Sequence, residues 1–300
     1  MPYSAKNKIP KIVMPICDDT LFCLKMSSFL FDKYWPKETK IDVIGFAKPD
    51  FKISKKMNFI SISDKQENGA KGWSKYILKY IRSLKDKQII LTLEDFFPTR
   101  EPNLLLLNKV KDLLQNNEKV GRFDLTFDSY SFGNFSTVKT FNNLTLIKKE
   151  RYSEYRVSTQ PSLWNVSFLT RILQNTTSPW DFEVNGSRIS NNLDYDVFAF
   201  GDKTYKNFPT YWIHKGAVSR QYPNKINVLG IDPQTIKEMV DLKLIDEKNL
   251  VWGMFNGVKP PSFEELGGYN FDPRKMPSHE ASRSNWKEYY HVYHKRMLDE

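Results

Sequence analysis

The chain has 300 residues, of which 40% are hydrophobic and 14% aromatic, so extensive disorder is excluded. Lysine and arginine number 45 against 35 aspartates and glutamates, and the net charge of +10 favours an anionic partner: a nucleotide, a nucleic acid or an acidic membrane. The two cysteines, Cys17 and Cys23, give neither a disulfide framework nor a zinc-binding spacing.

The first half of the chain alternates short apolar runs with segments of helical periodicity. Strands are predicted at residues 11–16, 41–47, 57–63, 88–97 and 120–127, and helices at 21–35, 74–87 and 103–117. Ser74 is the expected N-cap of the second helix. This alternation predicts an α/β fold with a mainly parallel sheet flanked by helices, in which ligands bind beyond the carboxyl ends of the strands. Those ends carry residues 17–19, residues 48–50, Asp64 and the pair Glu94–Asp95.

The second half loses this alternation. We expect a hairpin or strand pair within residues 141–165, a short helix at 166–173, and further strands at 197–203 and 208–218. Two helices have explicit starts, with Ser178 capping before Pro179 and Asp232 before Pro233. The simplest organisation is one domain over residues 1–257, with halves at about 11–130 and 131–257. An extension over 258–300 would pack on the domain or contact a partner or membrane.

Several catalytic signatures are missing from the sequence. It contains no GxxxxGK[ST], no GxGxxG after the first strand, no GxSxG and no HExxH, which argues against P-loop, dinucleotide-binding, α/β-hydrolase and zincin functions. No apolar run reaches the roughly 18 residues that span a bilayer, and the N-terminal segment makes a poor signal peptide. We therefore expect a cytoplasmic protein, either free or peripheral at a membrane.

The pair Glu94–Asp95 stands at the end of the apolar run IILTL, in the most strand-like part of the chain. Carboxylates at the exit of a buried strand must stay hydrated, find a cation or bind a metal, and Mg²⁺ and Mn²⁺ usually share oxygen ligands with substrate phosphates. One interpretation is a divalent cation that bridges a diphosphate. The alternative is an ordinary loop acid paired with Arg100 or Lys109.

Two aromatic and acidic segments follow, STQPSLWN at 158–165 and SPWDFE at 178–183. An aromatic wall beside fixed carboxylates suits a sugar ring, so this part of the chain is a candidate sugar site. Ser178 and Asp181 also match a capping box, so Asp181 could cap the helix and have no role in catalysis. For Glu183 the non-catalytic alternative is an ordinary exposed acid on the helix surface. The candidate sugar-binding residues are Gln160, Trp164, Trp180 and Arg220.

A third feature is the segment AKGWSKYI at 70–77, where a helix N-terminus can present N–H groups to phosphate. Trp73 would stack on a base, or it would simply pack against the sheet. Lys215 and Arg220 can assist a pyrophosphate group, or they are surface charges. His214 fits a structural role better than that of a ligand.

Together, the order of strands, LEDFF, QPSLWN and SPWDFE resembles the nucleotide-sugar-dependent glycosyltransferases of the GT-A fold, in particular a bacterial and viral group associated with surface polysaccharides. The resemblance spans roughly residues 12–220. It implies transfer of a sugar from a nucleotide-diphosphate donor to a hydroxyl of a glycan or lipid-linked acceptor. It also implies a divalent cation, Mn²⁺ or Mg²⁺, although the Asp-x-Asp motif of that fold is here Leu93-Glu94-Asp95, without its first carboxylate.

The resemblance also implies roles for individual residues. The implied metal ligand is Asp95, and the implied nucleotide-sugar contacts are Pro15, Cys17, Asp18, Gly45, Trp73, Ser74 and Glu94. The acceptor-activating base would be Glu183, with Asp181 second, in a direct displacement that inverts the anomeric carbon.

Two other functions are compatible with the same residues. A basic glycosyltransferase can act on modified DNA, although the lysines are dispersed and no recognition motif favours nucleic acid. A binding protein with a decayed catalytic centre would also fit the incomplete metal motif. The basic, aromatic segment 285–297 would lie on an anionic membrane, cover the domain or mediate dimerisation. The oligomeric state is not predicted.

Overall fold

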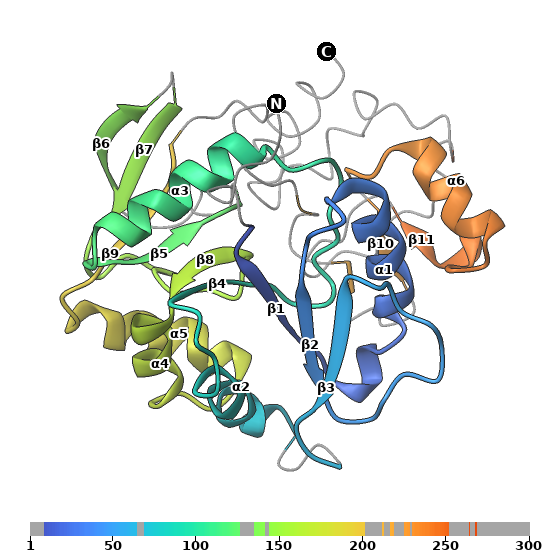
Figure 1. Cartoon of the computed structure of the whole chain (residues 1–300), viewed down its shortest axis with the longest axis horizontal. Coiled ribbons are helices and arrows are strands. Elements are labelled where there is room, and N and C mark those ends of the chain that lie inside the picture. Colours follow the sequence, from blue (N-terminus) through green and yellow to red (C-terminus); the bar gives the residue numbers. More distant parts are fainter. Residues whose placement is uncertain are drawn as a thin grey trace.

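The computed structural model describes residues 9–64, 69–126, 135–141, 144–201, 212, 217–218, 225–228, 230–251, 264 and 268. A nine-stranded sheet with the order β3-β2-β1-β4-β8-β5-β9-β7-β6 crosses the molecule (Figure 1). Its strands are β1 (Lys11–Pro15), β2 (Ile41–Gly45), β3 (Met57–Ser61), β4 (Gln88–Leu91), β5 (Val120–Asp124), β6 (Phe135–Phe141), β7 (Leu144–Lys149), β8 (Ser162–Asn165) and β9 (Asp196–Phe200).

The sheet is mainly parallel. Strands β3, β2, β1 and β4 pair in parallel, and so do β5 and β9. β8 lies between β4 and β5 and is antiparallel to both, so those two strands also point in the same direction. The hairpin β6–β7 extends the sheet beyond β9, with β7 antiparallel to β9. Among these nine strands only β7 and β8 therefore run against the common direction.

Helices cover both faces of the sheet (Figure 1). The described helices are α1 (Cys23–Tyr34), α2 (Trp73–Ile81), α3 (Leu104–Asn116), α4 (Val166–Leu173), α5 (Pro179–Asn191) and α6 (Pro233–Asp241). Side chains of α1 and α3 pack with alternate residues such as Ile12 and Met14, whereas α2, α4 and α5 pack with Val13 and Ile89 on the opposite face. Successive side chains of a strand point to opposite faces of the sheet, and helices cover both faces, so the central strands are apolar on both sides.

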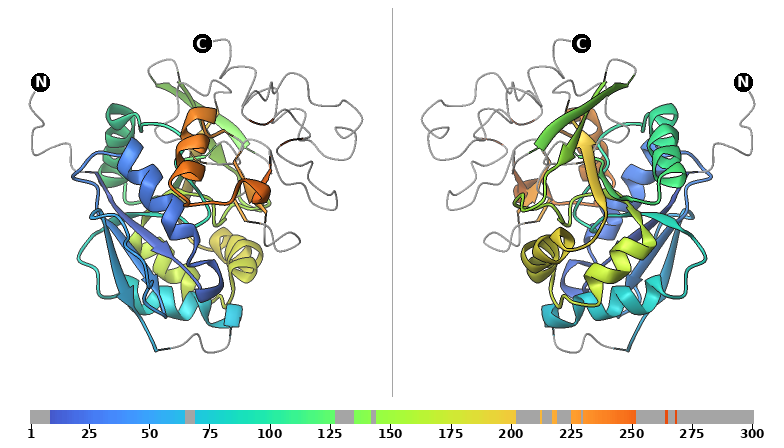
Figure 2. Two further views of the ribbon diagram at one scale, coloured as in Figure 1. Left: turned by 90° about the vertical axis from the view of Figure 1, so that its right-hand side faces the viewer. Right: turned by 90° about the vertical axis from the view of Figure 1, so that its left-hand side faces the viewer.

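A third apolar cluster lies on the far side of α1. Met26 and Leu30 of α1 meet Ile236 and Met239 of α6, together with the short parallel pair β10 (Ile226–Asn227) and β11 (Leu250–Val251). The salt bridge between Lys33 and Glu238 (2.6 Å) further ties α6 to α1. Figure 2 shows the two helices next to each other on this face of the molecule.

The predicted class, an α/β fold with a mainly parallel sheet flanked by helices, is confirmed. The caps Ser178 and Asp232 are also confirmed, since each side chain accepts a hydrogen bond from a first-turn N–H. The strand predicted at 88–97 is wrong beyond Leu91, where the chain leaves the sheet. Of the strand predicted at 208–218, only Trp212, Ala217 and Val218 lie among the described residues.

None of the helices in the described part of the chain combines the length and the hydrophobicity needed to cross a bilayer.

Candidate functional site

The topology brings the predicted site residues to one edge of the sheet. β1 ends at Pro15, β2 at Gly45 and β4 just before Glu94 and Asp95, so all three parallel strands deliver their following residues to the same edge. Because β8 is antiparallel to β4 and β5, the beginning of β8 lies at this edge. Ser162 is opposite Leu91 of β4 and Asp124 of β5. The QPS segment at 160–162 therefore enters the sheet at the edge where β4 leads into the acidic pair. Carboxyl edges of this kind are where α/β sheets bind ligands.

Glu94 and Asp95 lie in a turn after β4, and their backbone carbonyls accept hydrogen bonds from neighbouring segments. The Ser27 hydroxyl donates to the Glu94 carbonyl (3.0 Å), and the Ala217 N–H donates to the Asp95 carbonyl (2.7 Å). The Asp95 Oδ1 atom is buried and has no hydrogen-bond partner. Neither carboxylate forms an ion pair with a cation in the described part of the chain, so the predicted alternative of pairing with Arg100 or Lys109 is wrong.

Burial raises the pKa of both carboxyl groups. For Asp95 the shift is well above the ordinary value, because burial is reinforced by the neighbouring charge of Glu94 and only partly offset by backbone N–H donors. For Glu94 burial is the main cause, and a hydrogen bond from the Thr20 side chain opposes it. Two carboxyl groups that are both costly to ionise and lie side by side are typical of a functional site.

The buried, unpartnered Asp95 Oδ1 is the observation that fits a divalent cation at this edge. No group of three or more His, Cys, Asp and Glu side chains arranged to hold a metal occurs among the described residues. A hard cation commonly takes one or two carboxylates and completes its shell with water and substrate phosphates. The donor set therefore fits a cation shared with a phosphate ligand, and it does not fit one held by protein side chains alone.

The loops after β1 and β2 are joined at the same edge. Asp18 Oδ1 accepts a hydrogen bond from the Ala47 N–H (3.0 Å), and Cys17 Sγ lies 3.1 Å from Thr20 Oγ1. Burial raises the pKa of the Cys17 thiol, which is therefore neutral at physiological pH. At Gly45 a Cβ atom would come within 2.8 Å of the Ile16 side chain, so close packing explains this glycine.

Glu183 is fixed to Thr159, the residue just before the QPS segment. The Thr159 N–H and the Thr159 hydroxyl both donate to Glu183 Oε1, each at 2.8 Å. Its other oxygen, Oε2, forms no hydrogen bond with the described residues. Thr159 precedes β8 by three residues, and the beginning of β8 lies opposite the ends of β4 and β5. Glu183, which comes from α5, therefore contacts the chain just before it enters the sheet at that edge.

Asp181 caps the start of α5, which agrees with the capping box expected from the sequence. Its Oδ2 accepts hydrogen bonds from the Thr177 N–H (2.7 Å) and hydroxyl (3.1 Å), and its Oδ1 accepts from the Asn185 amide. Both oxygens are thus engaged, one by the residue before the N-cap and the other by a residue one turn further along α5. The structure does not support the predicted role of Asp181 as a second base.

We predict that Asp181→Ala lowers the free energy of unfolding by about 1 kcal/mol, the usual cost of losing a capping side chain. Urea unfolding followed by circular dichroism measures this loss. Ser190→Ala, which removes a hydroxyl at the other end of α5, is the comparison for the same helix. An unchanged unfolding midpoint for Asp181→Ala would contradict the capping role.

The predicted sugar-binding residues are not brought together as an aromatic wall. Trp164 is fully buried, where it contacts Phe168, Phe182 and the Arg122 guanidinium, so no face of its indole is open to a sugar. Its predicted sugar contact is therefore not supported, because β8 is a central strand and not a surface segment. Trp180, by contrast, is 47% exposed at the start of α5. Gln160 is buried at the sheet edge itself.

At the start of α2, one first-turn N–H group, that of Ser74, already has a partner. The helix begins at Trp73 with Gly72 as N-cap, so the predicted N-cap Ser74 is wrong. The Ser74 N–H donates to the Thr177 carbonyl (3.0 Å), and its buried hydroxyl lies 2.9 Å from the Thr176 hydroxyl. Trp73 packs edge-to-face on Phe182 at 5.3 Å, which is the packing alternative. These contacts tie α2 to α5 and to the segment before it.

His214, Lys215 and Arg220 lie outside the described residues. Sequence reasoning also missed Arg122, which is fully buried in β5. Its guanidinium donates to Ser158 Oγ (2.8 Å) and Ser162 Oγ (3.0 Å) and pairs with Asp124 (3.4 Å). The available signal was an arginine inside the apolar run at 120–127, because a buried charge requires hydrogen-bond partners. Arg122 thus fixes Ser158 and Ser162, the residues on either side of Thr159–Pro161.

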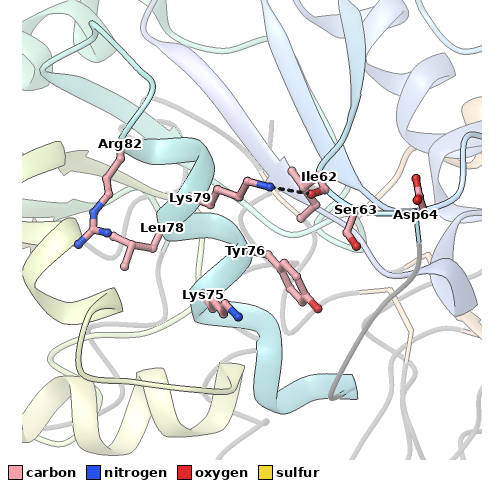
Figure 3. A pocket seen from close by; sticks show the side chains of 8 residues that line it. All are labelled: Ile62, Ser63, Asp64, Lys75, Tyr76, Leu78, Lys79 and Arg82. Carbon is pink, nitrogen blue, oxygen red and sulfur yellow. Dashed lines mark hydrogen bonds between the residues drawn. The ribbon is translucent and has the colours of Figure 1, made fainter.

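A concave surface of about 610 Å³ adjoins this edge between α2 and the residues after β3 (Figure 3). Lys79 reaches across it to donate to the Ile62 carbonyl (3.3 Å), and Tyr76 lies between α2 and the turn that carries Ser63 and Asp64. The Tyr76 ring meets Phe46, the residue after Gly45, at 4.8 Å. Asp64, predicted from its position after the third strand, therefore lies at an open cavity beside the end of β2.

No known protein-family model matches the chain, and no curated protein is similar to it in sequence. Several solved structures share part of its fold. UTP-bound UGPase from Acinetobacter baumannii aligns over 79% of this chain and 94% of its own, with 10% identity and a TM-score of 0.43. A CMP:2-keto-3-deoxy-manno-octonic acid synthetase in complex with CTP aligns over 63% and 88%, with 8% identity and a TM-score of 0.38.

S. aureus TarS 1-349 aligns over 77% of this chain and 63% of that one, with 11% identity and a TM-score of 0.39. Similarity at this level leaves the function to be argued from the chain's own residues.

Proposed function

We propose that the chain is a glycosyltransferase of the GT-A type, which moves a sugar from a nucleotide-diphosphate donor to a hydroxyl of a glycan or lipid-linked acceptor. The proposal rests on two carboxylates with different surroundings, Asp95 in the turn after β4 and Glu183 bound to the residue that precedes the QPS segment. Asp95 has a buried oxygen without a partner, whereas Glu183 is held by Thr159 with one oxygen left over. A cation-binding acid and an oriented base are the two groups that such a transfer requires.

The two carboxylates would divide the work. Asp95, with Glu94 beside it, would hold a divalent cation that neutralises charge on the donor's diphosphate. Glu183 would accept a proton at Oε2, because Thr159 occupies Oε1 and fixes the orientation of the group. The acceptor oxygen forms a bond to the anomeric carbon as its proton passes to Glu183. The bond from that carbon to the diphosphate breaks, and the nucleoside diphosphate leaves with the electron pair, so the configuration is inverted.

The cavity between α2 and the residues after β3 supports a place for the nucleotide near the end of β3. It carries cationic side chains, among them Lys75 and Lys79, which suit an anionic ligand. The solved structures that align with the chain include proteins bound to CTP, UTP and UDP-glucose, which agrees with a nucleotide or nucleotide-sugar ligand here.

We predict that UDP, GDP or dTDP raises the melting temperature of the protein by several degrees in the presence of Mn²⁺. Saturating ligand at 100 times Kd contributes about 2.7 kcal/mol. The measurement is a thermal-shift screen of nucleoside diphosphates with and without Mn²⁺, followed by release of nucleotide from UDP-, GDP- and dTDP-sugars. Incubation with nucleoside triphosphates and sugar 1-phosphates is the control. Pyrophosphate release in that control, without turnover of any nucleotide sugar, would contradict glycosyl transfer.

A further inference from the structure

A second concave surface lies away from the sheet edge, on the outer side of α1. It has a volume of about 670 Å³ and is bounded by α1, by residues 52–56 before β3, and by Leu242 and Leu244 after α6. We call it the lysine groove, because five of its lining residues are lysines: Lys25, Lys37, Lys52, Lys55 and Lys56. It lies on the face where Figure 2 shows α1 and α6 next to each other.

The walls of the lysine groove are tied together by buried polar contacts. The Ser54 N–H donates to Ser28 Oγ on α1 (3.1 Å), and the Ser54 hydroxyl donates to Asp32 (2.6 Å). Lys56 donates to the carbonyls of Phe31 and Trp35, both at 2.6 Å, and so closes the end of α1. Burial lowers the pKa of this lysine. The groove is therefore preformed, and Lys56 is a structural residue.

The remaining four lysines carry charge that the described part of the chain does not neutralise. Asp32 is the only acidic residue lining the groove, and it is engaged by Ser54 and Lys56. Lys25 lies over the Phe51 ring at 4.9 Å, and Lys37, Lys52 and Lys55 are exposed without an ion pair to a described residue. Several like charges around one hollow raise the local potential, which an anion would relieve.

Apolar side chains form the rest of the surface. Phe29 and Ile53 lie in the groove, and Leu242 and Leu244 border it after α6. Leu242 is 58% exposed, one of the few large apolar side chains of the described residues that is open to this degree. A soluble anion would engage the lysines and leave these side chains in water. A ligand with an anionic head and an apolar chain would engage both.

We propose that the lysine groove binds the phosphate headgroup of an anionic lipid. Lys25, Lys52 and Lys55 would contact the phosphate, and Leu242 would contact the adjoining acyl region. This site would bring the protein to a membrane surface, and it is independent of the carboxylates at the sheet edge.

The first test uses the full chain and sedimentation with vesicles of phosphatidylcholine, with and without phosphatidic acid. We expect binding only to the vesicles that contain phosphatidic acid. Each lysine near an anionic membrane contributes about fivefold in affinity, so Lys52→Gln/Lys55→Gln should weaken binding about 25-fold. Lys85→Gln/Lys87→Gln removes the same charge from exposed positions elsewhere and should retain most of the binding. Equal weakening in both double variants would overturn the proposal, because binding would then follow net charge alone.

The second test separates a lipid from a free phosphate. Leu242→Asn keeps all the lysines, and it should weaken vesicle binding several-fold if the acyl region is contacted. Inorganic pyrophosphate should compete only weakly. Full competition by pyrophosphate together with unchanged binding of Leu242→Asn would overturn the lipid and assign the groove to a soluble phosphate. Melting temperatures within a few degrees of the unmodified chain would verify that each variant is folded. Turnover of nucleotide sugars does not enter either test, so failure here leaves the proposed function untouched.

Discussion

Replacing Glu183 by glutamine is expected to lower sugar transfer by about 10²–10⁴-fold, the usual contribution of a positioned base. The substitution preserves the shape of the side chain and an oxygen that can accept from the Thr159 N–H and hydroxyl, both now at 2.8 Å. What it removes is the basic second oxygen. The loss should therefore fall on the rate of transfer, with little change in the affinity for the nucleotide. Release of nucleoside diphosphate at saturating donor and acceptor measures the rate.

The matched comparison for this variant is Asp181→Asn, on the same helix and two residues away. Asp181 is engaged at both oxygens by Thr177 and Asn185, so its removal from the reaction should cost little. Thermal shift with a nucleoside diphosphate provides the second readout, and it should be the same for Glu183→Gln as for the unmodified chain. Turnover that survives Glu183→Gln and falls with Asp181→Asn would exchange the two roles. Turnover that survives in both would contradict a carboxylate base on α5.

The sequence predicted the framework of the site better than its details, and the reason is physical. Each central strand is a short apolar run between polar turns, and the helices carry explicit caps such as Ser178 and Asp232, so local patterns suffice to find them. The carboxyl edge then follows from the parallel direction of the strands. The strand pattern of the sequence placed Asp64, Glu94 and Asp95 at the ends of the correct strands.

The position of β8 could not be predicted in this way. Its four residues, Ser162–Asn165, pair with β4 and β5 from distant parts of the chain, and nothing local distinguishes a central strand from a surface segment. That single insertion buries Trp164, which a surface segment would have exposed to a sugar. It also explains Arg122, whose guanidinium needs the hydroxyls of Ser158 and Ser162. Long-range pairing therefore determined which of the predicted site residues reach the edge.

Replacing Asp95 by asparagine is expected to stabilise the free protein at neutral pH and to abolish its response to Mn²⁺. Burial beside Glu94 places the pKa of Asp95 well above its ordinary value, so the ionised form is favoured in the unfolded chain. The protonated carboxyl makes its full contribution to the free energy of unfolding below the unfolded pKa of about 3.9. This contribution is lost as the pH rises through the folded pKa. Asparagine cannot ionise, and it avoids this loss.

The gain from Asp95→Asn should be about 1–3 kcal/mol at pH 7–8, the range for relieving a buried, unsatisfied polar group, and it should vanish near pH 4. Urea unfolding across this pH range measures it, and Asp112→Asn on the exposed side of α3 is the matched control for replacing a carboxylate by an amide. Mn²⁺ with a nucleoside diphosphate should then raise the melting temperature of the unmodified chain and leave that of Asp95→Asn unchanged. Stability and ligand response would thus move in opposite directions, which is expected of a residue kept for binding at the expense of folding. A variant that is less stable at pH 7–8 and still responds to Mn²⁺ would show that Asp95 is a structural residue.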